Sequence, residues 1–332
     1  MPVDPSPEPV ARTTDAAVDR TTPLAPELSL GTRLRHGKIV VAVDGGAEGV
    51  APVLVAEALQ RRFAASISAI QVMDLSAAPL PAPLPSLFTL ARDLIGDAPY
   101  ADDVRARHRQ FSDWIGTTND WPVHVALGTP ASEILRYAER EQAGLIVVGL
   151  RRHGIVDRML RDETTLMVAR RARGVVMGIV PTLLGLPHLA VVGVDFGPAS
   201  IRAARAALDV LAPATPAQPA SLRLVYVDRA GSGVRERSEG EAVVEQLGVA
   251  AAFERLAAEL NVPPGVTVES VVRRGAPAEE LLSYVEEVHA DLLAVGSLRH
   301  ERVERWLLGS VTTEVIRDGR CSVLVIPPVQ LS

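Results

Sequence analysis

The 332-residue chain contains one sequence pattern twice. Four blocks of the first half have counterparts in the second half, in the same order, and for three of them the corresponding residues are 147 positions apart, as Leu145 and Leu292 are. Self-similarity at a fixed offset indicates a repeated structural unit. We therefore predict a tail at residues 1–36 and two copies of one domain at residues 37–182 (copy one) and 183–332 (copy two). The four block pairs begin at Lys38 and His188, His124 and Val271, Leu145 and Leu292, and Gly174 and Cys321.

Each copy alternates apolar, β-branched runs with amphipathic stretches that have helical spacing. This alternation predicts an α/β fold with a parallel sheet that helices cover on both faces. Right-handed crossovers make a doubly wound, Rossmann-like sheet of five strands the simplest topology for each copy. The five strands of copy one are expected near residues 40–44, 66–73, up to 127, 145–148 and 175–180, and those of copy two near 191–195, 222–227, up to 274, 292–295 and 322–326.

Two segments do not fit the repeat. Residues 1–36 are rich in Pro, Thr, Ala and Asp and have no hydrophobic periodicity, so we expect this tail to be disordered. Leu75–Pro99 is a proline-rich insertion between the second strand and second helix of copy one. Such an insertion is either a packed loop or a lid over the strand ends.

Composition and charge exclude several classes of protein. The net charge of −6 argues against general nucleic-acid binding, and the single cysteine, Cys321, excludes an internal disulfide or a cysteine-rich zinc site. Because the N-terminus lacks the pattern of a secretory signal, we expect a cytoplasmic protein. The uncharged stretch Gly174–Val194 is long enough to span a bilayer, but its prolines favour two strands joined by a linker, so no membrane association is expected.

The end of copy two resembles a known family. Leu292–Pro328 is similar to the C-terminal signature of universal stress protein domains, in which Gly-x-x-Gly is followed after nine residues by Gly-Ser or Gly-Thr. The first strand ending in Asp and the Gly-x-Pro block before a helix resemble that family in both copies. The resemblance implies a tandem universal stress protein with the family's adenine-nucleotide hydrolase-like fold. It also implies a stress-response protein that binds ATP, AMP or a related nucleotide, with Mg²⁺ accompanying it, and that is not an enzyme beyond weak nucleotide hydrolysis.

Copy two keeps most of that signature. By the resemblance, its phosphate-binding residues are Gly296, Ser297, Gly309, Ser310 and Val311, while Asp195 and Val227 flank the ribose and the adenine. A glycine at a strand end lets phosphate approach the backbone, and the N–H groups of a helix start favour negative charge. The middle glycine is replaced by Arg299. Its guanidinium either donates paired hydrogen bonds to a phosphate, or its side chain occupies the space that the phosphate needs.

Copy one departs further from the signature. Gly149 is present and Asp44 ends the first strand, but Arg152 replaces the middle glycine and Asp162-Glu163 stands where copy two has Gly309-Ser310. Two carboxylates at a helix start satisfy the helix dipole and repel a triphosphate. We therefore expect copy one to be a degenerate domain without a phosphate site.

Two other functions stay open at this stage. The first is a scaffold that binds no nucleotide and recruits a protein partner, with both sites as relics. The second is an enzyme that acts on a nucleotide phosphate, with Asp195 holding a metal or water. By the resemblance, the closing strands Val175–Val180 and Ser322–Ile326 would meet across a pseudo-twofold axis and form an internal pseudo-dimer, which leaves further oligomerisation open.

Overall fold

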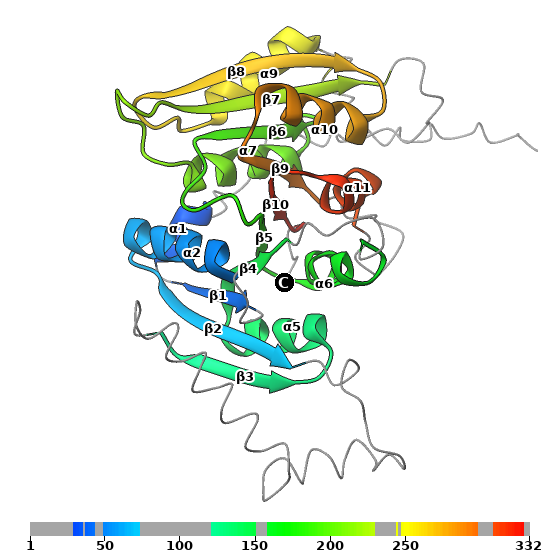
Figure 1. Ribbon diagram of the computed structural model, residues 1–332. Helices are drawn as coiled ribbons and strands as arrows, with labels where there is room; N and C mark the ends of the chain where they lie inside the picture. The colour runs from blue at the N-terminus through cyan, green and yellow to red at the C-terminus, as the bar shows by residue number, and fades with distance from the viewer. Residues whose placement is uncertain are drawn as a thin grey trace, which may run out of the picture.

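The computed structural model describes residues 29–35, 37–43, 49–73, 121–150, 158–229, 244, 247–297 and 308–328. Their strands form one ten-stranded sheet that runs through the whole molecule (Figure 1). The strands are β1 Lys38–Val43, β2 Ser66–Met73, β3 Val123–Leu127, β4 Ala143–Gly149, β5 Val175–Ile179, β6 Leu189–Val194, β7 Ala220–Asp228, β8 Val266–Arg274, β9 Leu292–Gly296 and β10 Ser322–Ile326. The helices are α1 Leu30–Arg35, α2 Val50–Phe63, α5 Pro130–Arg140, α6 Arg158–Arg171, α7 Pro198–Val210, α9 Val249–Glu259, α10 Pro277–Val288 and α11 Ser310–Asp318.

The strand order confirms the predicted fold class. The sheet reads β3-β2-β1-β4-β5-β10-β9-β6-β7-β8. Read from its outer edge towards the middle of the sheet, each half therefore has the third, second, first, fourth and fifth strand of its copy. All strand pairs within a half are parallel. This is the doubly wound arrangement, whose winding reverses between the first and fourth strands, β1 and β4 in copy one and β6 and β9 in copy two.

The two sheets are joined edge to edge. Strands β5 and β10 pair antiparallel, with Val323 opposite Gly178 and Val325 opposite Val176. The Val180 N–H extends this pairing by donating to Ser322 Oγ at 3.2 Å. The closing strands therefore meet as the family resemblance implied, and the two predicted five-stranded sheets are one continuous sheet. Because the central pair is antiparallel, the carboxyl ends of the strands face opposite edges of the sheet in the two copies.

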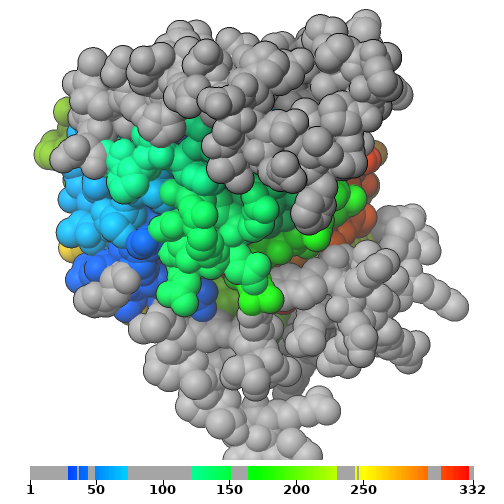
Figure 2. Space-filling view, turned by 90° about the horizontal axis from the view of Figure 1, so that it is seen from below, coloured from blue at the N-terminus to red at the C-terminus, as the bar shows by residue number. Residues whose placement is uncertain are grey.

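Helices cover both faces and bury a core that crosses from one copy into the other. One face holds α1, α2, α7 and α9, with Leu59 and Leu208 among its buried side chains. The other holds α5, α6, α10 and α11, with Ile134 and Val315 among its buried side chains. Figure 2 shows the end of the molecule that copy one forms, where residues around α5 and β3 (teal to green) lie beside those of α2 and β2 (blue to cyan).

The Gly-x-Pro blocks have the same conformation in both copies. Gly128 and Gly275 each have φ +143°, a value that glycine adopts without strain, and each follows the third strand. Pro130 and Pro277 are the first residues of α5 and α10, where a missing N–H removes no helical hydrogen bond. The repeat is thus preserved down to single turns.

The N-terminal expectation is wrong for its last residues. Residues 30–35 form α1, although we expected the tail to be disordered up to residue 36, and Leu34 is completely buried. Residues 1–28 and the Leu75–Pro99 insertion lie outside the described residues. The uncharged stretch Gly174–Val194 holds β5, a linker and β6, and none of the helices described is long and apolar enough to cross a membrane.

Candidate functional site

The candidate site is the edge of copy two at which β6, β7 and β9 end. Asp195 directly follows β6, Val227 lies in β7 next to its end, and Gly296 is the last residue of β9. Strand β6 lies between the other two, with Val194 beside Tyr226 and Val192 beside Ala294. The fold therefore brings these three predicted residues to one edge, at the reversal of winding where such folds bind ligands.

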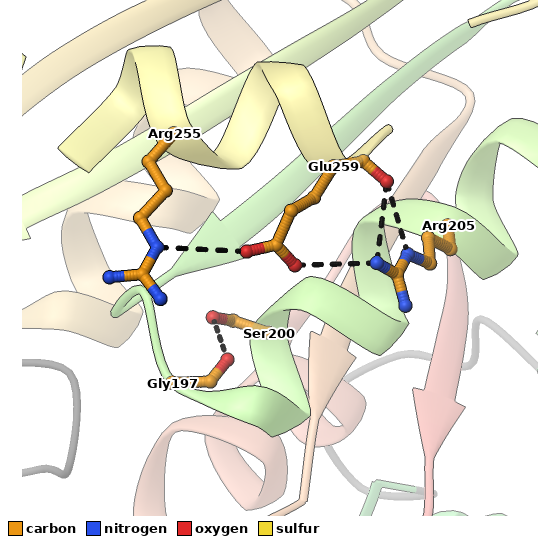
Figure 3. A network of polar contacts seen from close by, with 5 residues as sticks. All are labelled: Gly197, Ser200, Arg205, Arg255 and Glu259. Carbon is orange, nitrogen blue, oxygen red and sulfur yellow. Dashed lines mark hydrogen bonds and ion pairs between the residues drawn. The ribbon is translucent and has the colours of Figure 1, made fainter. Parts of the chain in front are cut away.

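The loop after β6 is built by hydrogen bonds of its own. The Asp195 carboxylate accepts the Gly197 N–H at 3.0 Å, and the Asp195 N–H donates to Ser200 Oγ at 3.3 Å. The Ser200 hydroxyl donates in turn to the Gly197 carbonyl at 3.0 Å (Figure 3). Asp195 is half-buried and thus first of all holds the turn that leads into α7. Ser200 was not predicted, and the signal for it is the Asp-x-Gly-Pro-x-Ser run.

An aromatic cluster fixes the same loop from the side of the core. Phe196 has φ +63°, which is uncommon for a residue with a side chain. Its ring lies 5.3 Å from that of Tyr226 and 4.9 Å, edge-on, from that of Phe253. Only 6% of Phe196 is exposed, so packing of the ring stabilises the left-handed backbone. Sequence reasoning missed this residue because its role depends on Phe253 in α9.

Ion pairs hold α7 against α9. Arg205 Nη2 lies 3.3 Å from Glu259 Oε2, and the same nitrogen donates to the Glu259 carbonyl at 3.3 Å. Arg255 Nε approaches the other oxygen of Glu259 at 3.8 Å (Figure 3). Arg205 thus places positive charge at the carboxyl end of α9, where helix carbonyls lack partners. The helix that starts at the candidate site is in this way fixed to its neighbour.

The two glycines of the signature in copy two have different surroundings. A Cβ on Gly296 would lie 2.5 Å from the backbone carbonyl carbon and oxygen of Ala199 in α7. Gly296 is therefore required by the contact between β9 and α7. A Cβ on Gly309 would meet nothing within 4 Å. The space at Gly309 is open as far as the described residues are concerned.

Helix α11 begins next to this open space. Gly309 is its N-cap, without a side-chain hydrogen bond to the cap, and Ser310 is its first, exposed residue. Val311 is half-buried, and the Thr313 N–H donates to the Gly309 carbonyl at 3.0 Å. The N–H groups that precede Thr313 have no partner within the helix, as at every helix start. Ser297 is buried, and its N–H donates to the Ile326 carbonyl at 2.8 Å, while Arg299 lies outside the described residues.

Copy one has a different arrangement at the corresponding place. Helix α6 begins at Arg158, so Asp162 and Glu163 lie inside the helix and not at its start. In a helix that begins there, the N–H of residue 162 is paired with the carbonyl of residue 158. This corrects the expectation of two carboxylates at a helix start. The backbone donors that copy two offers at Ser310 are used within the helix in copy one.

The other residues of copy one add little to a site. Gly149 ends β4, and of the residues that the structure describes, only the Pro52 side chain would lie near a Cβ on it, at 3.6 Å. Leu150 follows it, where copy two has Ser297, and is buried. Asp44 and Arg152 lie outside the described residues.

Two cavities lie away from these strand ends. One, of about 530 Å³, is at the junction of the copies and is lined in part by Val180, His289 and Cys321. The other, of about 380 Å³, lies beside α5 and is lined by His124, Glu133, Arg136, Tyr137 and Arg140. Neither contains a residue of the predicted nucleotide site. Among the residues described, no three His, Cys, Asp or Glu side chains are grouped as a metal site.

Comparison with known proteins identifies the family. The sequence matches the universal stress protein family over residues 36–177 and again over 189–327. It is 39% identical over 62 residues to universal stress protein MJ0531 of Methanocaldococcus jannaschii, which is 19% of this chain and 36% of that protein. It is 33% identical over 70 residues to universal stress protein YxiE of Bacillus subtilis, which is 21% of this chain and 47% of that protein. The chain therefore spans less than half the length of these curated relatives.

A solved structure shares the fold over nearly the whole chain. A universal stress protein from Archaeoglobus fulgidus superposes with a TM-score of 0.56 at 17% identity, covering 87% of this chain and 98% of that one. The two matched ranges cover most of the sequence and correspond to the two halves of the sheet. The chain belongs to the universal stress protein family and contains two domains of that family in tandem.

Proposed function

We propose that the protein binds an adenine nucleotide, such as ATP or AMP, in copy two, as a sensor or carrier and not as an enzyme. The phosphates would lie at the start of α11, with Gly309, Ser310 and Val311 offering backbone N–H groups and Ser310 its hydroxyl. The ribose and adenine would lie at the ends of β6 and β7, beside Asp195 and Val227. Mg²⁺ would enter with the nucleotide.

The observation that carries the proposal is the difference between α11 and α6. Helix α11 begins at Ser310, beside a glycine around which there is open space. Helix α6 begins five residues earlier in the repeat, so its matching N–H groups are already paired. A single chain therefore contains one copy that offers an anion-binding helix start at this position and one that does not. We infer that copy one does not bind nucleotide.

The second candidate function is a scaffold that binds a protein partner and no nucleotide. The packing of Gly296 favours this candidate. Since this glycine is explained by its contact with Ala199, its presence is not evidence for a phosphate nearby. The two candidates differ in what Ser310 and Gly309 do. In the scaffold they only begin a helix.

Isothermal titration of the full chain with ATP tests the proposal through two variants of one residue. Ser310→Glu adds a carboxylate at an exposed helix start, where it interacts favourably with the helix dipole but repels phosphate. Ser310→Gln has nearly the same shape without the charge. We expect Ser310→Glu to weaken ATP binding at least about tenfold more than Ser310→Gln does, which corresponds to about 1.4 kcal/mol.

Thermal unfolding of the same variants is the control. Both variants should unfold within a few degrees of the wild type, because the substituted side chain is exposed. Equal ATP affinity in Ser310→Glu and Ser310→Gln would exclude a phosphate at α11. Absence of any binding by the wild type would favour the scaffold, and conversion of ATP to other nucleotides, followed by chromatography, would contradict a role without catalysis.

A further inference from the structure

The cavity beside α5, of about 380 Å³, takes no part in the nucleotide site proposed above. It lies at the outer end of copy one, where β3 is the last strand of the sheet and α5 packs on its face (Figure 1). His124 comes from β3, while Glu133, Arg136, Tyr137 and Arg140 come from α5. A cavity of this volume is large enough for a small molecule.

An aromatic pair forms one wall of the cavity. The rings of His124 and Tyr137 are stacked, with 4.8 Å between their centroids and 3° between their planes. The guanidinium of Arg140 lies over the Tyr137 ring, 4.8 Å from its centroid. Only 5% of Tyr137 is exposed, so the core fixes the ring on which Arg140 lies. The contact with the ring face leaves the N–H donors of the guanidinium for an acceptor.

These donors of Arg140 are largely unused. Its Nε lies 3.6 Å from Glu141 Oε1, beyond the range of a normal hydrogen bond, and the other oxygen of Glu141 accepts a hydrogen bond from Lys38 at 2.7 Å. Within the described part of the chain, no other carboxylate makes an ion pair with Arg140. Arg136, one turn earlier in α5, pairs with Glu133. These three cationic and two acidic side chains leave one positive charge in excess.

The corresponding place in copy two contains a complete network. Tyr284 stands 147 positions after Tyr137, and the guanidinium of Arg273 lies over its ring, 5.5 Å from the centroid. Arg273 donates through Nε to Glu280 at 3.0 Å and through Nη1 to Glu287 at 2.9 Å. In copy two, the cation on this tyrosine thus has carboxylates of the chain itself as its acceptors.

Copy one reverses this charge pattern. Ala126 stands where copy two has Arg273, and Arg140 stands where copy two has Glu287. The cation over the tyrosine therefore comes from the helix in copy one, and the carboxylate that accepts from it in copy two is missing. A carboxylate from outside the chain would complete the network in copy one.

We propose that the cavity beside α5 in copy one binds a small dicarboxylic acid. One carboxylate would accept hydrogen bonds from Arg140, and the other would meet Arg136, which lies one turn away on the same side of α5. The side chains of Arg136 and Arg140 are 73% and 59% exposed, so a ligand from solvent can reach both. The proposal is independent of nucleotide binding, because all of these residues belong to copy one.

Titration of the full chain with succinate tests the site, without nucleotide and at constant ionic strength. The NMR signals of the His124 ring report binding, since this ring lines the cavity. We expect a saturable shift with succinate and none with succinamide, its uncharged diamide. Arg140→Gln should weaken succinate binding at least about tenfold, because it removes the charge that pairs with the ligand.

Arg173→Gln is the matched control. Arg173 pairs with Glu139 of α5 at 3.0 Å and does not line the cavity, so its replacement removes an equal charge from the same helix. This variant should bind succinate as the wild type does. Equal weakening in Arg173→Gln and Arg140→Gln would mean that only net charge attracts the anion, and would overturn the proposal.

A double variant tests the comparison between the copies. Ala126→Arg combined with Arg140→Glu gives copy one the residues that copy two has at these positions, so an internal ion pair should replace the ligand and succinate binding should be lost. Arg140→Gln changes an exposed side chain and keeps the test decisive if the double variant does not fold. Absence of saturable succinate binding in the wild type would overturn the proposal, as would an equal response to succinamide or unchanged affinity in Arg140→Gln.

Discussion

Two glycines that the repeat equates, Gly149 and Gly296, are present for different reasons. The sequence predicts both at strand ends, and the structure places both there. It does not predict that the first turn of α7 lies against Gly296 while no described residue lies as close to Gly149, because that contact depends on how closely a helix packs on the sheet. The presence of Gly296 is thus explained by packing and does not by itself indicate a phosphate beside it.

Substitution of each glycine by alanine should show which of the two is required for packing. In Gly296→Ala the new methyl group would be 2.5 Å from backbone atoms of Ala199, so we expect a loss of about 1–3 kcal/mol of unfolding free energy. In Gly149→Ala it would lie 3.6 Å from Pro52, an ordinary contact, and the change should stay within about 0.5 kcal/mol. Denaturant unfolding measures both, and similar losses in the two variants would show that the contact with Ala199 is not the reason for Gly296.

His124 should titrate below the usual pKa of 6.5. It stacks on Tyr137 at 4.8 Å, and burial, together with the charges of Arg140 and Arg136, lowers its pKa. The contribution of His124 to stability is therefore complete above pH 6.5 and is lost as the pH falls through the depressed pKa. NMR titration measures this directly. Arg140→Gln should raise the midpoint, and a midpoint at or above the usual value in the wild type would contradict the structure.

At the scale of elements, strands were easier to predict than helix starts. The apolar runs located the first, second, fourth and fifth strand of each copy, and the Gly-x-Pro blocks located the end of the third strand and the starts of α5 and α10, because each signal lies within or directly beside the element that it defines. The start of α6 has no such signal. The repeat suggested Glu163 by analogy with Ser310, but the helix extends to Arg158. This extension, more than the two carboxylates, distinguishes the copies.

Proline at the two matched positions should reveal that difference. Ser310 is the first residue of α11 and follows a glycine with extended ψ, so Ser310→Pro should cost less than about 1 kcal/mol. Glu163 is inside α6, where proline removes a hydrogen bond and clashes with the preceding turn, so Glu163→Pro should cost about 3 kcal/mol. Thermal or denaturant unfolding gives the comparison, and a tolerated Glu163→Pro would mean that α6 begins later.

At the scale of the molecule, the sequence led to two copies, and the resemblance to the family led to their contact through the closing strands. Neither the sequence nor the resemblance predicted α1. Its six residues have no hydrophobic periodicity of their own, and its partners, Phe63 and Asp209, come from different copies. The antiparallel junction turns the strand ends of the copies to opposite edges. Any nucleotide in copy two would therefore lie far from the corresponding strand ends of copy one. A protein partner and further oligomerisation stay predictions.

The number of ATP molecules that one full-length chain binds tests the central claim most directly. Isothermal titration at saturating concentration should give one ATP per chain, and Ser310→Glu should weaken that binding while Glu163→Gln leaves it unchanged. Two ATP molecules per chain would contradict the degenerate state of copy one, and none would contradict the anion-binding helix start in copy two.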